Sequence, residues 1–365
     1  MSQNATTDAA GAQSGARGSS LLTLLSPKRI SGIYIFIGLI VFYSITTTTF
    51  LSETTLRTIA SEQAITAILA MGLTVALAAG VFDLSIGGVM GLSNIIVARL
   101  MADAGMDPIF AILLTLAAAL VIGLINGILV TKAKIDPFIA TLGMNSILLA
   151  GIAIVSQTQN ILGVPEGFLK VASNEILGIP ITVFYMLALA LVLVYILQMT
   201  PIGRRLYATG GGREVARLAG VPTDRYIIGA FMTSATVAAI GGILIVATVG
   251  TGSPAVGPSY LLPAFAAGFL GATQFFPGRF NIWGTVLAVY LLATGVKGLV
   301  LMGSDPWVTD AFNGLALIIA VGLSGYQGRA RRSREKKTGA EESSMGPPAD
   351  RPTTSEGRPA GSGVS

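Results

Sequence analysis

Long apolar runs constrain this chain of 365 residues more than any other feature of its sequence. Ten stretches of roughly 16–24 residues are almost wholly apolar, close to the length that a helix needs to cross about 30 Å of hydrocarbon. Their apolar character is continuous rather than alternating, which favours helices over barrel strands. The sequence therefore predicts an all-α polytopic membrane protein with about ten transmembrane helices, at residues 30–50, 58–80, 84–102, 108–131, 137–157, 179–198, 226–248, 260–275, 281–301 and 306–325.

The distribution of basic residues predicts how these helices are oriented. With the N-terminus in the cytoplasm and ten spans, 19 of the 23 Lys and Arg residues fall in cytoplasmic segments. The exceptions are Arg57, Arg99, Lys170 and Lys297. Because basic residues are enriched on the cytoplasmic side of membrane proteins, we expect both termini to lie there. The turn near Asp83 carries no basic residue, which leaves open a break within the membrane in place of a cytoplasmic loop.

The two ends of the chain differ in composition from its centre. Residues 1–29 and 328–365 are rich in Ser, Gly, Ala, Pro and charged residues, and we expect them to be disordered cytoplasmic tails around a transmembrane permease domain at 30–327. The positive charge lies in these tails and not on a folded face, which argues against nucleic acid as a partner. The basic run 329–337 directly follows the last apolar stretch and is expected to stop transfer and to contact anionic membrane lipid.

The residue types that are missing exclude most enzyme chemistry. The chain contains neither cysteine nor histidine, so it has no disulfide, no thiolate nucleophile and no Cys/His metal site. It also lacks the Gly-x-x-x-x-Gly-Lys-Ser/Thr loop that binds nucleotide phosphates. We therefore predict no catalytic residue, no metal and no cofactor. Any ATP chemistry must come from another subunit.

Asp83 is the only carboxylate between Glu62 and Asp103. Acidic residues at membrane depth are energetically expensive and are candidates for function by default. The alternative is a structural role, because Asp83 or Ser85 can accept hydrogen bonds from the free amides where the third span begins. A broken helix that faces a cavity would combine the two roles.

Residues 199–225 form the longest internal cytoplasmic segment, and a short helix is expected at about Arg213 to Ala219. The glycines at 210–212 break the chain before it, and Glu214 is an acid in its first turn. Gly220 suits the left-handed position after a helix, and Pro222 prevents continuation. Such a helix across the cytoplasmic mouth would suit contact with a motor subunit, whereas the alternative is a solvated connector.

This segment resembles the coupling loop of bacterial ABC-importer permeases of the ribose type. The counterparts of the family's two motifs are Gly203, Tyr207, Ala208, Gly210 and Gly211, followed by Glu214, Val215, Ala216, Arg217, Leu218 and Gly220. Further stretches at 80–87, 137–143 and 271–285 are similar to other motifs of that family and occur in its order. Val215, Phe275, Phe276 and Phe280 depart from the family's pattern.

The resemblance implies the membrane-spanning permease subunit of an ATP-binding-cassette importer in the bacterial plasma (inner) membrane. Its substrate would be a sugar or related polyol delivered by an extracytoplasmic sugar-binding protein. Its other partners would be a separate ATP-binding cassette subunit and a second permease copy, either identical or a paralogue. The candidate coupling residues are Gly203, Arg204, Tyr207, Glu214, Ala216, Arg217 and Gly220. The candidate residues of the substrate path are Asp83, Ser85, Asn94, Thr141 and Asn145.

Two other function classes fit the composition less well. An ion-coupled secondary transporter of a small polar solute would need several buried ionisable groups acting together, and Asp83 has no evident partner. An intramembrane enzyme would need paired carboxylates or the missing histidine and cysteine.

Glycine pairs such as Gly87/Gly91 and Gly123/Gly127 are expected to be sites of close helix packing more than ligand contacts. The loops at 157–178 and 251–259 are expected on the external side. The first is expected to be a connector or a docking surface for the binding protein, and the second an external loop or a re-entrant segment.

Overall fold

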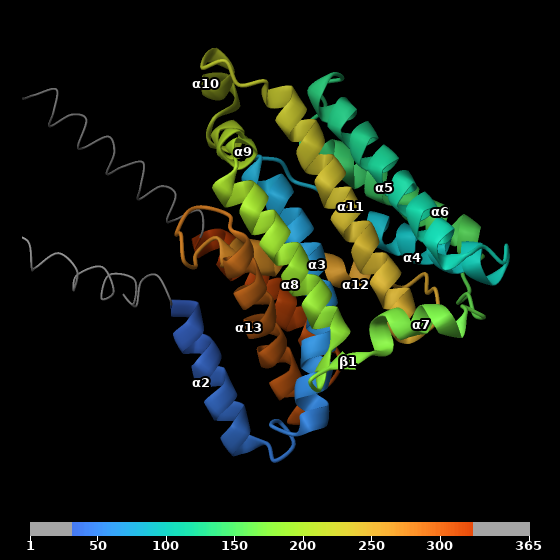
Figure 1. The fold of residues 1–365 in the computed structure, drawn as a ribbon. Helices are drawn as coiled ribbons and strands as arrows, with labels where there is room; N and C mark the ends of the chain where they lie inside the picture. The colour runs from blue at the N-terminus through green and yellow to red at the C-terminus, as the bar shows by residue number, and fades with distance from the viewer. Residues whose placement is uncertain (1–30, 324–365) are drawn as a thin grey trace, which may run out of the picture.

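The computed structural model of the chain describes residues 31–323, so the two predicted tails, at 1–29 and 328–365, lie outside the described residues (Figure 1). The described part is almost entirely helical, as the apolar runs predict, and its only strands form one small hairpin. The elements are α2 (Ser31–Thr46), α3 (Glu53–Ala78), α4 (Ile86–Ala102), α5 (Pro108–Thr131), α6 (Pro137–Ser156), α7 (Glu166–Ser173), β1 (Glu175–Ile176), β2 (Ile179–Pro180), α8 (Ile181–Val194), a π-helical turn Tyr195–Met199, α9 (Pro201–Gly211), α10 (Arg213–Leu218), α11 (Thr223–Val249), α12 (Pro258–Gly271), α13 (Ile282–Leu301) and the helix Trp307–Leu323.

Every predicted span coincides with a helix, but the helices differ in length. Within residues 31–323, six helices are long and apolar enough to cross a membrane: α3, α5, α6, α8 with its π-helical turn, α11 and α13. The other four are α2, α4, α12 and Trp307–Leu323, and at 1.5 Å per residue the 14 residues of α12 span only about 21 Å. Length and composition therefore support a polytopic helical membrane protein without reproducing the count of ten.

Two helices, α3 and α11, form the centre of the bundle. Small residues dominate their buried surfaces, including a run from Ala64 to Ala78 in α3. The helix α11 packs against α3, α4 and α5, and α3 also packs against α12 and α13. By contrast, α5 and α6 expose many large apolar side chains, such as Ile109, Phe110 and Ile147. Apolar side chains on an outer face are what lipid contact requires.

Glycine allows the closest approaches between these helices. A methyl group added at Gly123 or Gly127 of α5 would lie within 3 Å of the α11 backbone, at Met232 and Ile228 respectively. Gly87 and Gly91 of α4 contact the backbone of Gly257 and Val256 in the same way. Gly123 and Gly127 therefore serve helix packing as predicted, whereas Gly87 and Gly91 pack on the segment that precedes α12.

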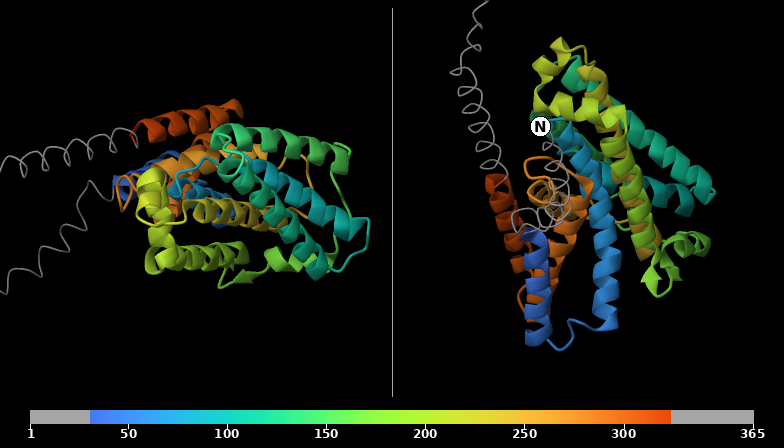
Figure 2. Two further views of the ribbon diagram at one scale, coloured as in Figure 1. Left: turned by 90° about the horizontal axis from the view of Figure 1, so that it is seen from above. Right: turned by 60° about the vertical axis from the view of Figure 1, so that its left-hand side comes forward.

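The two ends of the bundle carry different small elements. The paired helices α9 and α10 lie at one end, and α7 with the β1–β2 hairpin lies at the other (Figures 1 and 2). The loop at 157–178, expected to be a connector or a docking surface, contains the short helix α7, whose Phe168 is buried. Residues 251–257 fold back against α4, and Gly252 pairs with Ile161 of the loop before α7.

Candidate functional site

Asp83 lies in the non-helical segment between α3 and α4 and is almost completely buried, with 2% of its surface exposed. Its Oδ1 atom accepts hydrogen bonds from the backbone N of Ser85 (3.1 Å) and from Ser85 Oγ (2.6 Å). Its Oδ2 atom accepts one from Ser234 Oγ of α11 (2.7 Å). Asn126 of α5 extends the network, because its Nδ2 donates to Ser85 Oγ (2.8 Å). We call Asp83, Ser85, Asn126 and Ser234 the Asp83 cluster.

Two residues of α6 satisfy other backbone amides at the beginning of α4. Thr141 Oγ1 accepts from the backbone N of Leu84 (3.1 Å), and Asn145 Oδ1 accepts from that of Gly88 (3.1 Å). Their spacing of four residues places both side chains on one face of α6. The first amides of a helix have no acceptor within the helix. Thr141 and Asn145 supply acceptors for two amides at the beginning of α4.

The structure thus brings together four of the five residues predicted to form the substrate path. Asp83, Ser85, Thr141 and Asn145 meet at the beginning of α4. Asp83 accepts from a backbone amide there, as the structural alternative expects, whereas the Ser85 side chain caps no amide and donates to Asp83 instead. Asn94 lies apart from them in the middle of α4. Its Nδ2 donates to the carbonyl of Gly242 (3.4 Å), and its Oδ1 accepts from the backbone N of Ser253 (2.8 Å).

Sequence reasoning missed Asn126 and Ser234, the two members of the Asp83 cluster that come from other helices. Asn126 is a lone amide in the apolar run 108–131, and that isolation was the available signal. Ser234 carries no such signal, because its hydroxyl group is unremarkable in a helix that also holds Thr233 and Thr236. The cluster has hydroxyl and amide partners for its one carboxylate and, within residues 31–323, no basic side chain bonded to it.

The segment 199–225 holds two helices where one was expected. Gly210 and Gly211 were predicted to break the chain but belong to the end of α9, and the helix stops only at Gly212. The reason is a close contact: a methyl group at Gly210 would collide with the carbonyl of Ala78 and the amide of Gly80, at the end of α3. The helix α9 continues through Gly210 because only a residue without a side chain fits against the end of α3 at this point. Gly80 has a positive φ of 79° and touches Gly210 in return.

The candidate coupling residues of α9 attach that helix to the rest of the chain. Gly203 packs closely on the carbonyl of Leu197 in the π-helical turn, and Arg204 is exposed. The Tyr207 hydroxyl donates to the carbonyl of Phe280 (2.7 Å), and the guanidinium of Arg279 lies 3.7 Å from the centre of its ring. Burial raises the pKa of the Tyr207 phenol above its usual value, although the charge of Arg279 opposes this shift.

The helix α10 is exposed on most of its surface. Glu214 lies in its first turn as predicted and pairs with Arg217 (3.0 Å), and both side chains are mostly solvent-accessible. Val215 and Leu218 expose 73% and 86% of their surfaces, and only Ala216 is buried. Two exposed apolar side chains beside an ion pair on one short helix are typical of a contact surface for another protein.

The end of α10 has the geometry that the sequence predicts. Gly220 has a φ of 82°, in the left-handed region. Its backbone N donates to the carbonyl of Arg217 (3.0 Å), and that of Val221 donates to the carbonyl of Ala216 (3.0 Å). This pair of bonds is the Schellman motif, which satisfies the last carbonyls of a helix. Asp224 then holds the next turn through Arg213 (2.9 Å).

Comparison with known proteins adds an independent finding. The sequence pattern of the family described as "Branched-chain amino acid transport system / permease component" matches residues 55–321. The ribose import permease protein of Bacillus subtilis is 33% identical over 78% of this chain and 90% of its own length. The D-allose transport system permease protein of Escherichia coli is 29% identical, covering 80% and 90%, and the fructose import permease protein of Rhizobium meliloti is 31% identical, covering 82% and 85%. No solved structure gives a significant match.

Proposed function

The chain belongs to the family of branched-chain amino acid transport system permease components, and on that premise we propose that it is the membrane-spanning subunit of an ATP-binding-cassette importer for a sugar or related polyol. The three relatives named above are sugar import or transport permeases by description, and this chain covers 85–90% of their lengths. The observation in the structure that best supports the proposal is the exposed α10, joined through α9 to the backbone beside the Asp83 cluster.

We propose that energy enters the chain at α9 and α10. The sequence has no nucleotide-binding loop, so a separate ATP-binding cassette subunit would hydrolyse ATP. Val215 and Leu218 would fill an apolar pocket of that subunit, with Glu214 and Arg217 beside them. Movement of α9 would then reach Gly80 through the backbone contact at Gly210. Coupling of this kind requires an element whose conformation both partners influence. The α9–α10 pair would contact both the ATP-binding cassette subunit and the Gly80 segment.

We propose ten membrane helices with both termini in the cytoplasm. Two groups of charged residues support this orientation. Lys132, Arg213 and Asp224 lie together at the α10 end, where Lys132 Nζ is 3.7 Å from Asp224 Oδ2. At the opposite end, Arg57 pairs with Glu175 of the hairpin (2.9 Å). Under this proposal α4 and α12 cross the bilayer together with the non-helical segments that precede them.

The other proposed partners would meet the remaining surfaces. An extracytoplasmic sugar-binding protein would dock at the end that carries α7 and the hairpin, where Leu177 is 95% exposed. A second permease copy would complete the pathway, and membrane lipid would cover the apolar faces of α5 and α6. In this role the chain carries out transport and not catalysis.

Uptake measurements test the proposal directly. The chain would be expressed with the ATP-binding cassette subunit and binding protein encoded beside it, in a bacterium that lacks its own uptake of ribose, allose and fructose. We expect uptake of at least one radiolabelled sugar of this set, and its loss when the phosphate-binding lysine of the ATPase is replaced. Uptake that survives this replacement but stops when a protonophore collapses the ion gradient would instead identify an ion-coupled secondary transporter.

A further inference from the structure

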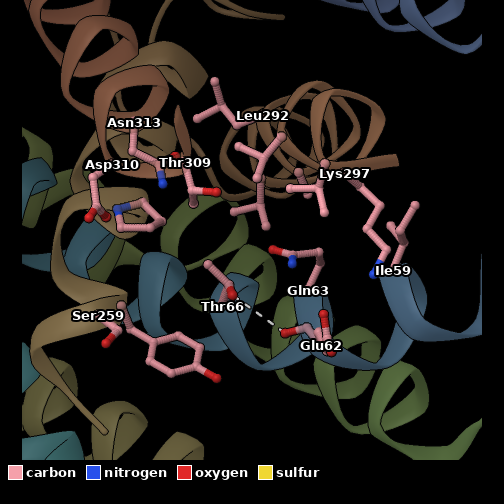
Figure 3. Close-up of a pocket in the computed structure, with 16 residues that line it drawn as sticks. Ile59, Glu62, Gln63, Thr66, Ser259, Leu292, Lys297, Thr309, Asp310 and Asn313 are labelled. Atoms are coloured by element: carbon pink, nitrogen blue, oxygen red, sulfur yellow. Dashed lines mark hydrogen bonds between the residues drawn. The ribbon is translucent and has the colours of Figure 1, made fainter. Parts of the chain in front are cut away.

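A polar cleft lies between helices that the sequence places in the membrane, and no residue of the predicted path belongs to it. It is bounded by α3, α12, α13 and the helix Trp307–Leu323, and has a volume of about 430 Å³ (Figure 3). Small-molecule sites in proteins occupy about 300–1,000 Å³. The cleft is therefore large enough for one small solute.

Ionisable side chains of both signs line the cleft. Glu62 of α3 is exposed and lies four residues inside the predicted span 58–80, about 6 Å along that helix. Lys297 of α13 and Asp310 of the helix Trp307–Leu323 face the same space (Figure 3). None of the three forms an ion pair within residues 31–323. Charged side chains inside membrane helices are expensive and face water or a polar partner in preference to lipid.

Two amide side chains in the cleft also lack partners. Gln63 and Asn313 line it from opposite sides (Figure 3), and neither side chain makes a hydrogen bond to any described residue. Asn313 is only 8% exposed. An amide that lines a cleft without a partner in the chain is available to bond to water or to a ligand that fills the cleft. In the Asp83 cluster the four side chains bond to one another, and only the Oδ1 atom of Asn126 is buried there without a partner among the described residues.

We propose that this cleft binds a neutral polyhydroxylated solute during transport, an inference that rests on the proposed import of a sugar. A hydroxyl group both donates and accepts hydrogen bonds. The cleft offers acceptors in Glu62 and Asp310, a donor in Lys297, and amides that do both in Gln63 and Asn313. An apolar wall formed by α13, including Leu292, faces the same volume and suits the carbon skeleton of a sugar.

The charge pattern argues against an anionic solute. An anion would lie beside the two carboxylates of Glu62 and Asp310, and Lys297 offsets only one of these two negative charges. A metal ion would be held by a cluster of carboxylates, and among the described residues no group of three or more potential metal-binding acids occurs. A neutral solute meets none of these repulsions.

The natural absence of cysteine makes a labelling experiment possible without prior mutation. Gln63→Cys and Asn313→Cys would be introduced singly into the assembled transporter, with Ser146→Cys on the exposed face of α6 as the control outside the cleft. We expect a charged, membrane-impermeant methanethiosulfonate to label both cleft cysteines faster than the control. The sugar that the wild-type transporter imports should slow this labelling, whereas sodium chloride or glutamate at equal concentration should not.

Uptake by alanine variants gives a second readout. Gln63→Ala and Asn313→Ala should each lower sugar uptake about tenfold, as loss of one hydrogen bond to the solute implies, with yield and thermal stability equal to those of Ser146→Ala. If the wild type imports a sugar but the sugar gives no protection and both alanine variants transport normally, the cleft proposal is wrong and the proposed function stands. Protection by sodium chloride would also overturn it, in favour of a cation site. If the wild type imports no sugar, both proposals fail.

Discussion

Asp83 and the short helix α10 were both singled out from sequence, yet their side chains have opposite surroundings in the structure. At Asp83 every carboxylate oxygen is bonded inside the chain, to Ser85 and Ser234. At α10 the side chains of Val215 and Leu218 contact almost nothing of their own chain. A polar group whose hydrogen bonds are all made within the chain contributes mainly to the stability of the fold. An exposed apolar surface is instead available to bind a partner protein. The variants below test that distinction, from the largest expected effect on stability and uptake together to the smallest.

Asp83→Ala should have the largest effect on stability. The change leaves the Ser85 amide and the Ser85 and Ser234 hydroxyls without their acceptor in a buried site. Each unsatisfied buried group costs about 1–3 kcal/mol. We expect little folded protein after detergent extraction, measured by size-exclusion chromatography and thermal unfolding.

Asp83→Asn provides the control, because it retains one acceptor oxygen and removes the negative charge. Intermediate stability with near-normal uptake per folded molecule would identify Asp83 as a structural residue. Wild-type stability with uptake abolished in Asp83→Asn would contradict that assignment and move Asp83 to the substrate path.

Gly210→Ala should have the next largest effect, because Gly210 is in contact with the backbone of Ala78 and Gly80 and a methyl group does not fit there. Inserting a methyl into a packed contact costs about 1–3 kcal/mol. Gly211→Ala is the matched control, since no atom lies within 4 Å of the methyl it would add. We expect ATP-driven uptake to fall in Gly210→Ala alone. Equal uptake in both variants would show that α9 does not act through the Gly80 segment.

Gly220→Val tests the end of α10 with a smaller expected cost. A β-branched residue at a φ of 82° pays the steric penalty of the left-handed conformation, about 1–2 kcal/mol. We expect a membrane-inserted chain with little uptake and with substrate-stimulated ATP hydrolysis lost or uncoupled. Normal uptake and normal stimulated hydrolysis at wild-type expression would place the contact with the motor elsewhere.

Glu214→Lys tests the surface of α10 itself and should hardly change stability, because exposed ion pairs contribute little. The double variant Glu214→Lys with Arg217→Glu restores the ion pair within α10 in reversed order and serves as the control. If Glu214 faces a partner, uptake stays low in both variants. Recovery in the double variant would confine the role of Glu214 to its own helix.

Thr141→Val should have the smallest effect of this set. It removes the acceptor for the Leu84 amide while keeping the shape of the side chain. We expect a loss of about 1 kcal/mol, seen as a lower unfolding temperature, and uptake close to that of the wild type. Unchanged stability with lost uptake would instead support contact between Thr141 and the substrate.

The sequence predicted local features well and distant contacts poorly. Continuous apolarity located the six helices that are long enough to cross a membrane and the four shorter apolar helices within residues 31–323. The order of Glu214, Gly220 and Pro222 predicted where α10 begins and ends. Helix propensity failed at Gly210, because glycine disfavours a helix by only about 1 kcal/mol and a tight packing contact outweighs this. The partners of Asp83 could not be predicted, since Asn126 and Ser234 come from helices that only the tertiary fold brings to it.

The same argument explains why the cleft near Glu62 escaped sequence reasoning. In the sequence, Gln63 and Thr66 are only polar residues within the mostly apolar stretch that forms α3. Asn313 is a single amide in a helix far from them along the chain. Only the packing of α3 with α12, α13 and the helix Trp307–Leu323 places them around one volume. A site made from four segments of the chain leaves no motif at any one of them.

The contact between Gly80 and Gly210 also limits how this protein can evolve. At most packed contacts a larger residue on one side is compensated by a smaller residue on the other. Here both residues are already glycine, so neither can shrink to accommodate growth of its neighbour. Suppressors of Gly210→Ala must therefore arise away from the contact, at positions that shift the backbone of α9 or of the turn after α3. A genetic selection for restored growth on the imported sugar would trace those positions.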